Sequence, residues 1–273
     1  MNYKITSSIV IYNNDEKILK SAIKSVLNVS SVNILFLIDN SEKNIFFQLK
    51  KIDSRIIYIH NPSNPGYGSG HNIAIKKAIT FGSKYHFIVN PDIYFNNNII
   101  DPMIQYMKLN SNIGMMMPKI LNKDNSVQFL PKLLPNPLSI ILRKIKYPSF
   151  LHKKFINWYE LRFVDQEKIY YAPIISGCFT LLNANAIKKI GMYDDSFFMY
   201  FEDWDLSRRI NQKFKTVYYP KVSVYHEYNS EANKNKKLFK IFLRSAFNYF
   251  NKWGWFFDKN RSFINKKTLD QFK

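Results

Sequence analysis

The sequence predicts an α/β fold built around a mostly parallel central sheet. Short apolar runs alternate with amphipathic segments through the first third of the 273-residue chain, as in successive βαβ units. Polar residues directly follow the apolar runs, and the carboxyl ends of parallel strands form the ligand-binding edge of such a sheet. We expect one domain over residues 1–230 and a C-terminal helical segment over residues 231–273.

The elements of this domain follow in order. Four short apolar runs are expected to form strands, over residues 6–12, 32–38, 56–60 and 85–89. Residues 15–29 carry apolar side chains at helical spacing, and residues 72–81 form the second expected helix. Residues 130–165 differ, because four prolines interrupt them and cations alternate with large apolar residues. We interpret this stretch as an insertion in the domain.

The chain carries an unusually large positive charge. Forty lysines and arginines against twenty acidic residues give a net charge of +20. Such an excess implies an anionic partner: a nucleic acid, an acidic membrane surface or a phosphorylated substrate. The single cysteine, Cys178, excludes an internal disulfide framework. No apolar run reaches the length of about eighteen residues that a spanning helix needs, and the N-terminal run is too short for a signal peptide. A cytoplasmic protein is expected.

A glycine-rich segment, NPSNPGYGSGHN, occupies residues 61–72. Its glycines Gly66, Gly68 and Gly70 permit positive φ angles and close approach of the backbone to a ligand. The helix that follows presents its N-terminus to a phosphate. The segment is not a dinucleotide-binding fingerprint, because His71 stands where that motif requires glycine, and no Gly-Lys-Ser/Thr closes a P-loop. A surface turn and a phosphate-binding loop both fit this segment.

The most informative stretch is FFMYFEDWDLSRR, residues 197–209. It places three carboxylates, Glu202, Asp203 and Asp205, within four positions, between aromatic residues and an arginine pair. Acidic residues at the start of a helix are favoured by its dipole, and Asp205 with Arg209 makes an ordinary i, i+4 pair. A purely structural role therefore fits this motif when it is taken alone. The preceding ISGCFTLLNANAIKKIGMYDD adds an apolar run between two glycines, followed by acidic residues.

Together these two segments resemble the acceptor-side motif of inverting family 2 glycosyltransferases. That family has the GT-A fold, an α/β/α sandwich. The matching positions are Glu202, Asp203, Asp205, Leu206 and Arg209. The resemblance implies that Asp203 is the general base on an acceptor hydroxyl and that Glu202 contacts the acceptor or donor sugar. Which of these two carboxylates is the base stays open at this point. Further acceptor-side contacts are expected from Trp204, Asp205 and Arg209.

The resemblance extends to the first half of the chain. The nucleotide-sugar loop of the family matches at Asn64, Gly66, Gly68, Gly70 and Asn72. By the same resemblance, Tyr12 and Asn13 flank the nucleobase and Asp39 contacts it, since a carboxylate can accept a hydrogen bond from a pyrimidine N–H. Asn90 and Gly177 complete the predicted nucleotide-sugar site.

A metal site is implied by two further positions. Asn90-Pro91-Asp92 follows an apolar strand, where the family carries its metal motif, and His226 ends another apolar run. The resemblance implies that Asp92 and His226 bind Mg²⁺ or Mn²⁺, with phosphate oxygens and water in the remaining positions. The family often adds a serine a few residues on, here Ser230. A turn role for Asp92 and a structural role for the histidine are the alternatives.

The resemblance is to enzymes of bacterial O-antigen and capsule assembly, many of them rhamnosyltransferases. It implies dTDP-rhamnose as the first candidate donor, a UDP-hexose as the second, and a saccharide or polyprenyl-diphosphate-linked acceptor. A basic nucleic-acid-binding protein and a nucleotidyltransferase on a related sheet are the alternatives. We expect no nucleic-acid partner, because the cations cluster in residues 132–154 and 234–267 and not at the strand ends.

The C-terminal segment alternates bulky apolar residues with cations. On a helix, one stripe contains Leu238, Ile241, Phe242, Ser245, Tyr249 and Trp253. Basic amphipathic helices of this kind lie on anionic membranes, which predicts peripheral attachment to the inner face of the cell membrane. A helix docked on the catalytic domain is the alternative.

Overall fold

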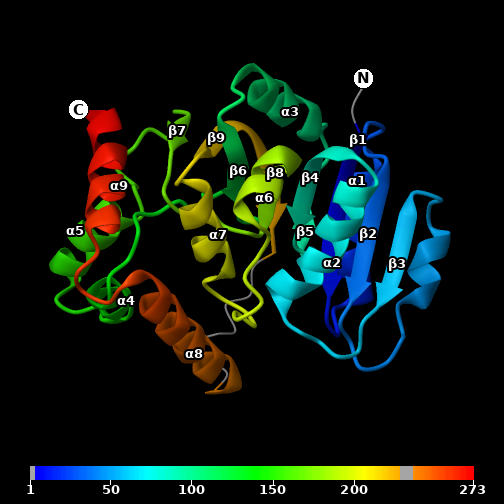
Figure 1. Ribbon diagram of the computed structural model, residues 1–273, viewed down its shortest axis with the longest axis horizontal. Helices are drawn as coiled ribbons and strands as arrows, with labels where there is room; N and C mark the ends of the chain where they lie inside the picture. The colour runs from blue at the N-terminus through cyan, green and yellow to red at the C-terminus, as the bar shows by residue number, and fades with distance from the viewer. Residues whose placement is uncertain (1–3, 228–235) are drawn as a thin grey trace.

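The computed structural model describes residues 4–227 and 236–273 and confirms the α/β architecture (Figure 1). These residues form one nine-stranded sheet in the order β3-β2-β1-β4-β8-β6-β9-β5, with β7 paired to β9. The strands are β1 (Lys4–Ile11), β2 (Ile34–Asp39), β3 (Ile56–His60), β4 (Ser83–Val89), β5 (Ile93–Tyr94), β6 (Ile113–Leu121), β7 (Tyr170–Tyr171), β8 (Phe179–Asn183) and β9 (Lys215–His226).

The sheet is parallel in its N-terminal half and mixed beyond it. Strands β1 to β4 pair in parallel, β8 runs antiparallel to both of its neighbours, and β6 is again parallel to β9. The carboxyl ends of β1, β2 and β4 therefore lie at one edge. The prediction of a mostly parallel sheet is confirmed, and the predicted polar residues Tyr12, Asn13, Asn40 and Asn90 lie directly beyond these three ends.

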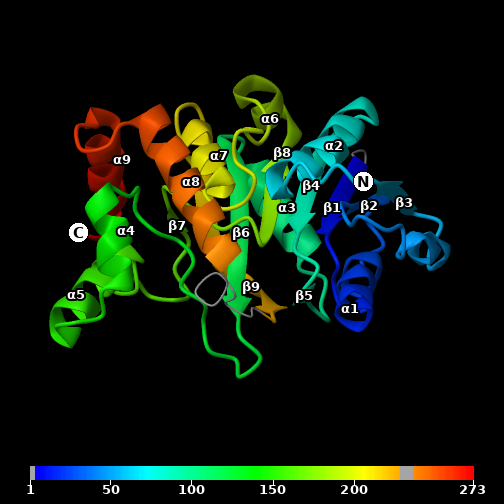
Figure 2. The ribbon, with the colours of Figure 1, turned by 90° about the horizontal axis from the view of Figure 1, so that it is seen from below.

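Helices cover both faces of the parallel half. α1 (Glu16–Leu27) begins after Asp15, whose carboxylate accepts hydrogen bonds from two amides of the first turn. Figure 2 shows α1 on one face of the sheet and α2 (Tyr67–Thr80) on the other. Neighbouring residues of β1 accordingly pack into different hydrophobic clusters, Ile9 with the side chains of α1 and Val10 with those of α2.

Helix α2 begins at Tyr67, earlier than the predicted start at residue 72. Gly66 precedes it with a φ of +107°, and a Cβ at that position would lie 2.1 Å from the carbonyl oxygen of Phe198. Gly68 and Gly70 are inside the first turns of the helix, where they allow close contact with other elements. Gly66 thus allows the chain to turn into α2, and Gly68 and Gly70 allow the helix to pack closely. The sequence pattern did not distinguish these roles from that of a glycine-rich loop.

Residues 130–165 contain two helices, α4 (Pro137–Lys144) and α5 (Ser149–Tyr159). Both lie at the end of the molecule opposite β3 (Figures 1 and 2). The rest of this half comprises α3 (Ile100–Leu109), α6 (Ala184–Ile190) and α7 (Glu202–Ile210). Figure 1 places α7 between the sheet and the C-terminal helices, so the acidic motif is near the middle of the molecule.

The C-terminal segment forms α8 (Lys236–Trp253), α9 (Lys259–Leu269) and a short 3-10 helix, Asp270–Phe272. The predicted stripe on α8 packs on the catalytic domain, since Ser245 and Tyr249 are only 2% and 0% exposed. Its cluster with the acidic motif contains Phe197, Phe201, Trp204, Ala246, Tyr249 and Phe250. Ser245 and Tyr249 are therefore docked on the domain, as the alternative predicted, while Leu238, Ile241 and Phe242 are only partly buried, and membrane attachment stays a prediction. The predicted boundary at residue 230, with Ser230, lies outside the described residues.

Buried ion pairs join the tail to α7. Arg208 Nη2 lies 2.6 Å from Asp258 Oδ2, and their side chains are 2% and 4% exposed. Lys252 Nζ lies 2.8 Å from Asp205 Oδ1, and the indole nitrogen of Trp253 donates to the same oxygen over 2.9 Å. Within residues 4–227 and 236–273, no helix is long and apolar enough to cross a membrane.

Asp258→Asn is expected to lower the free energy of unfolding by about 3 kcal/mol, because it leaves Arg208 charged and buried without its counter-ion. Asparagine can still cap α9, as Asp258 does through the amide of Arg261. Urea denaturation measures the loss. The matched control is Asp270→Asn, which removes an exposed acid paired with Lys273 and should change stability far less, because solvent screens an exposed pair. Equal effects of the two substitutions would contradict this account of the tail.

Candidate active site

A cleft of about 1790 Å³ opens along the carboxyl ends of β1, β2 and β4. The N-terminal half contributes mainly neutral polar groups to its wall: Tyr12, Asn13, Asn40, Asn64, Gly66 and Asn90. The start of α7, the α4–α5 insertion and the first half of α8 form the rest of the wall. The cleft therefore joins the predicted nucleotide-sugar residues of the first half to the predicted acceptor-side motif of the second.

Asp203 is held at this cleft by backbone amides. Its Oδ2 accepts a hydrogen bond from the Gly177 amide over 3.0 Å, and its Oδ1 accepts one from the Trp204 amide over 2.9 Å. Burial raises the pKa of the Asp203 carboxyl, while the Gly177 amide and the positive charge of Lys132 act in the opposite direction. The carboxylate is thus fixed in orientation and more basic than an exposed aspartate.

Glu202 lies in a drier environment than its neighbour. Its side chain is buried, and among the described residues its Oε2 atom has no hydrogen-bond partner. Burial raises the pKa of Glu202 well above its ordinary value, and the adjacent Asp203 charge adds to the effect. The two environments favour a protonated Glu202 beside an ionised Asp203, because the Gly177 amide and the charge of Lys132 stabilise the Asp203 anion.

The backbone before these acids is strained. Tyr200 and Phe201 have φ angles of +69° and +66°, a left-handed conformation that side chains other than glycine rarely adopt. Phe201 is 2% exposed and packs against Trp204 at 4.5 Å between ring centroids. Buried aromatic packing therefore stabilises a strained backbone conformation directly before Glu202 and Asp203 at the start of α7.

Tyr67 connects the two halves of the site. Its hydroxyl lies 2.8 Å from Asn90 Oδ1 and 2.8 Å from the carbonyl oxygen of Gly177. Gly177 in turn approaches Asp203 closely, and a Cβ added to it would lie 3.3 Å from the Asp203 Cβ. Asn90, at the end of β4, and Asp203, at the start of α7, are thereby connected through Tyr67 and Gly177.

Asp92 and His226 meet at the edge of the cleft. The short pair of strands β5 and β9 aligns Ile93 with His226, which brings His226 Nε2 to 3.3 Å from Asp92 Oδ1. Gln128 orients the imidazole through a 3.0 Å contact with its Nδ1. Burial disfavours the charged imidazole, but the contacts with Cys178 and Asp92 outweigh it and raise the pKa of His226 to about 10.

These two side chains fit a divalent cation. Asp92 Oδ1 is buried and makes no hydrogen bond with the described residues, although it faces His226 Nε2. An oriented imidazole beside a carboxylate is a suitable half of a coordination sphere, and a cation bound there would displace the imidazolium proton. No group of three or more His, Cys, Asp or Glu side chains in the described ranges could hold an ion. Other ligands would have to come from substrate phosphates and water.

Several predicted site residues lie behind the cleft wall. The Asn72 amide donates to the Tyr193 carbonyl over 2.8 Å and accepts from the Tyr193 amide over 3.0 Å, so it ties α2 to the 193–195 loop. A Cβ on Gly68 would meet Tyr193, and one on Gly70 would meet Val10. Gly68, Gly70 and Asn72 therefore position the site through packing.

The role predicted for Asp39 is also changed by its surroundings. Its side chain is 0% exposed, and its two oxygens accept hydrogen bonds from the Tyr58 hydroxyl over 2.6 Å and the Ser41 amide over 2.9 Å. The cleft wall includes the next residue, Asn40, and not Asp39. Asp39 organises the turn after β2, while Asn40 faces the cleft.

Asp205 and Arg209 serve the structure of the acidic motif. Arg209 Nε donates to Asp205 Oδ2 over 2.7 Å, and its Nη2 donates to the Met192 carbonyl over 2.6 Å. Asp205 is completely buried and also receives Lys252 and Trp253 of the tail. The acceptor contacts predicted for Asp205 and Arg209 do not fit this placement, whereas Trp204 does line the cleft.

Lys132 is the functional candidate that the motifs missed. It lines the cleft with a side chain only 7% exposed, and its Nζ lies 5.3 Å from the centroid of the Trp204 ring. Burial lowers the pKa of Lys132 to about 8, and Arg143 acts in the same direction. A lysine among prolines in a basic stretch gave no signal of burial. Pairing of residue 132 with Ile174 places it there.

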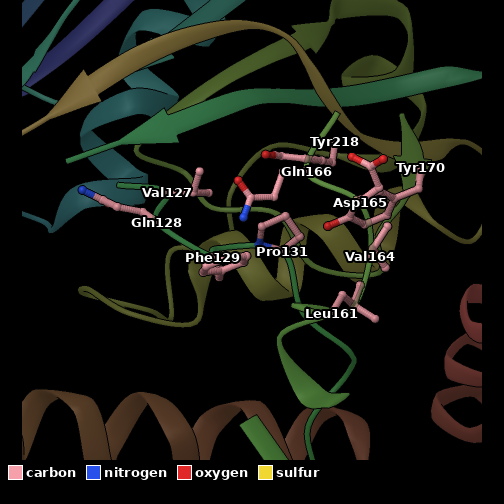
Figure 3. A pocket seen from close by; sticks show the side chains of 10 residues that line it. All are labelled: Val127, Gln128, Phe129, Pro131, Leu161, Val164, Asp165, Gln166, Tyr170 and Tyr218. Carbon is pink, nitrogen blue, oxygen red and sulfur yellow. The ribbon is translucent and has the colours of Figure 1, made fainter. Parts of the chain in front are cut away.

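A second, much smaller pocket lies between the insertion and the sheet (Figure 3). Its volume of about 10 Å³ is enough for roughly one water molecule. Gln128 is the residue that it shares with the large cleft, and in Figure 3 the Gln128 side chain extends away from the other lining residues. This pocket cannot hold a sugar.

A mixed sheet whose parallel strand ends face an acidic helix start is the arrangement expected of a GT-A fold. Residues 7–191 match the family described as glycosyl transferase family 2. The chain therefore belongs to glycosyltransferase family 2. The matched range ends before the carboxylates at 202 and 203, so the acceptor-side motif stands on the geometry described above.

Two curated relatives illustrate the similarity. The chain is 25% identical over 187 residues to the low-salt glycan biosynthesis hexosyltransferase Agl10 of Haloferax volcanii, covering 68% of this chain and 55% of the relative. It is 23% identical over 175 residues to the N-acetylglucosaminyl-diphospho-decaprenol L-rhamnosyltransferase of Mycobacterium tuberculosis, covering 60% and 56%. The chain thus spans about half the length of the curated relatives it matches.

Solved structures share the fold. GalNAc-T7, solved with UDP, GalNAc and Mn²⁺, superposes with a TM-score of 0.62 at 17% identity, covering 84% of this chain and 44% of that one. S. aureus TarS gives a TM-score of 0.58 at 11% identity, covering 98% and 42%. These two structures confirm the predicted GT-A fold.

Proposed function

We propose that this glycosyltransferase moves a sugar from a nucleoside-diphosphate sugar to an acceptor hydroxyl with inversion at the anomeric carbon. The observation that carries the proposal is the placement of Asp203. Its carboxylate is oriented by the Gly177 amide at a cleft whose other side is formed by neutral strand-end residues and the Asp92–His226 pair. One base and one leaving-group site in a shared cleft suit a single displacement.

The acceptor oxygen forms a bond to the anomeric carbon while the bond from that carbon to the diphosphate oxygen breaks. The acceptor proton passes to the Asp203 carboxylate, and the electron pair of the broken bond leaves with the nucleoside diphosphate. Glu202, kept protonated by its burial, can donate a hydrogen bond to a sugar oxygen. Attack from the side opposite the diphosphate inverts the anomeric configuration.

Asp92 and His226 are proposed to hold the diphosphate end of the donor. A bound Mg²⁺ or Mn²⁺ would supply charge stabilisation for the departing diphosphate. The presence of Mn²⁺ with UDP in the solved GalNAc-T7 structure supports a divalent cation. Gln128 fixes the orientation of the His226 ring, and Asn90 extends the polar wall beside it.

The donor and acceptor follow from the relatives and the charge. The M. tuberculosis relative is named as an L-rhamnosyltransferase acting on N-acetylglucosaminyl-diphospho-decaprenol, and the H. volcanii relative as a hexosyltransferase. We therefore rank dTDP-rhamnose first and a UDP-hexose second, with a saccharide acceptor on a polyprenyl diphosphate. The net charge of +20 suits such an acceptor and work at an anionic membrane surface. Bacterial O-antigen or capsule assembly is the proposed process, at the inner face of the membrane.

A thermal-shift screen of nucleotide sugars with and without Mn²⁺ tests this proposal. At a donor concentration of about 100 Kd, the correct donor is expected to raise the midpoint of unfolding by about 5–10 °C, because it binds only the folded chain. dTDP-rhamnose should give the largest shift and should lose it in EDTA. The proposed donor class would be wrong if no nucleotide sugar raised the midpoint of unfolding. It would also be wrong if only the corresponding free sugars raised it. A larger shift with a UDP-hexose would reverse the ranking.

A further inference from the structure

The α4–α5 insertion exposes an unusual amount of apolar surface. Leu138 and Ile141 lie three residues apart on α4, Ile145 directly follows the helix, and each of the three is 51–53% exposed. Beyond the turn, the exposed fractions are 85% for Tyr147 and 67% for Phe150. Leu151, at 52%, completes what we call the α4–α5 face: Leu138, Ile141, Ile145, Tyr147, Phe150 and Leu151. A surface of this kind in one region marks an interaction site.

We propose that the α4–α5 face docks the enzyme on an anionic lipid bilayer. Residues 137–159 contain five lysines and arginines and no aspartate or glutamate. Arg143, Lys144, Lys146, Lys153 and Lys154 are interleaved with the apolar residues, as in segments that lie at a membrane interface. Apolar side chains can enter the interfacial region while the long cationic side chains reach the anionic headgroups.

The charge pattern favours a bilayer over a second copy of the chain. In a symmetric dimer across the α4–α5 face, Lys144, Lys146, Lys153 and Lys154 of one copy would approach the same four of the other without any acid from residues 137–159 between them. Arg143 is already paired with Glu160 and adds less to this repulsion. Juxtaposed like charges cost energy at an interface. Any other face of a second copy belongs to a molecule with a net charge of +20. An anionic lipid surface supplies the opposite charge that this face needs.

The cleft opens beside this face. Arg143, Lys144, Lys153 and Lys154 belong both to the insertion and to the wall of the catalytic cleft. A chain docked through the α4–α5 face would therefore present its cleft mouth to molecules embedded in the bilayer. This step rests on the proposed function, because it gives a reason for membrane attachment only if the acceptor is lipid-linked. It also places the attachment surface on the insertion and not on the C-terminal stripe, of which Ser245 and Tyr249 are buried on the domain while Leu238, Ile241 and Phe242 line the cleft.

Co-sedimentation of the full chain with vesicles tests the docking. Binding is expected to vesicles containing about one third phosphatidylglycerol at low salt, and not to pure phosphatidylcholine vesicles. The double substitution Phe150→Ser/Leu151→Ser is expected to weaken binding by tenfold or more, since the buried apolar area sets much of the affinity. Lys146→Gln should weaken it about fivefold, as expected for the loss of one cation near the surface. None of these three residues lines the cleft.

Matched controls distinguish binding through the α4–α5 face from non-specific binding to vesicles. Leu109→Ser removes an apolar side chain that is 84% exposed on α3, and Lys76→Gln removes an exposed cation on α2. Both should leave vesicle binding unchanged. Phe239→Ser/Leu243→Ser alters the exposed side of α8 instead. The proposal is overturned if the α8 variant loses binding while Phe150→Ser/Leu151→Ser keeps it, or if wild-type chain dimerises through residues 150 and 151 and ignores vesicles.

An activity readout distinguishes failure of docking from failure of the proposed function. With a water-soluble acceptor, Phe150→Ser/Leu151→Ser should match the wild type. With the same saccharide on a polyprenyl diphosphate in vesicles, the variant should lose about tenfold or more in kcat/KM, in proportion to its lost binding. Vesicle binding without transfer to either acceptor would sink the proposed function and leave the docking intact. Equal transfer by both proteins to the vesicle-borne acceptor would overturn the docking.

Discussion

Asp203→Asn is expected to lower the rate of transfer by about 10²–10⁴-fold while leaving the affinity for the nucleoside diphosphate unchanged. Asparagine keeps the size of the side chain, and its oxygen can still accept from the Gly177 amide that orients Asp203. It cannot accept the proton of the acceptor hydroxyl. Single-turnover transfer and calorimetric titration of the nucleoside diphosphate measure the two quantities separately.

Glu202→Gln is the matched control for this substitution. Because burial keeps Glu202 protonated, the amide is expected to replace it with a loss well below that of Asp203→Asn. If Glu202→Gln abolishes transfer and Asp203→Asn does not, the base has been assigned to the wrong carboxylate. The pH profile gives an independent check. The base must be ionised, so transfer should fall as the pH drops through the raised pKa of Asp203.

Lys132, in the cleft wall, is expected to influence the pH–rate profile. The positive charge of Lys132 lowers the pKa of Asp203, so Lys132→Met should move the acidic limb of the pH–rate profile to higher pH. Lys76→Met, on the exposed side of α2, should leave the limb in place. A merely structural role for Lys132 would lower the rate without moving the limb.

Asp92→Ala is expected to weaken cation-dependent binding of the nucleoside diphosphate by at least about tenfold. Asp92 is the only carboxylate that faces His226 Nε2 among the described residues, and the substitution removes it. Titration calorimetry with Mn²⁺ and with EDTA measures the effect. The control is Glu42→Ala, which removes an exposed acid outside the cleft wall. A wild-type chain whose binding is the same in EDTA would show that Asp92 is a turn residue.

The sequence predicts best those features that depend on local pattern. The strands at residues 56–60 and 85–89 are apolar runs whose ends are set by neighbouring polar residues, and the structure reproduces them closely. The pair Asp92–His226 combines a turn after β4 with the last residue of β9. A family motif predicted both residues, but only the pairing of β5 with β9 brings them together.

The sequence pattern could not predict the features that depend on tertiary contacts. Asp39 follows an apolar strand as a ligand-binding acid does, yet the Tyr58 hydroxyl from the neighbouring strand occupies its carboxylate. Arg209 has the spacing of a surface pair, and its direction is set by carbonyls of the 190–192 loop. Lys132 lies in a stretch whose composition predicts solvent exposure. In each case a partner distant in sequence decides which way the side chain faces.

The ion pairs between α7 and the tail have a consequence for synthesis. Arg208 and Asp205 are buried, and their partners Asp258, Lys252 and Trp253 come much later in the chain. Asp205 has Arg209 as a counter-ion on the same helix, but until residue 258 leaves the ribosome Arg208 carries a charge that α7 cannot bury without a large energetic cost. The sheet can form from the earlier strands, but the acidic motif cannot be completed with it. We therefore expect the nascent chain to form its donor-side edge first, and the catalytic carboxylates to reach their final setting only when the tail packs on α7.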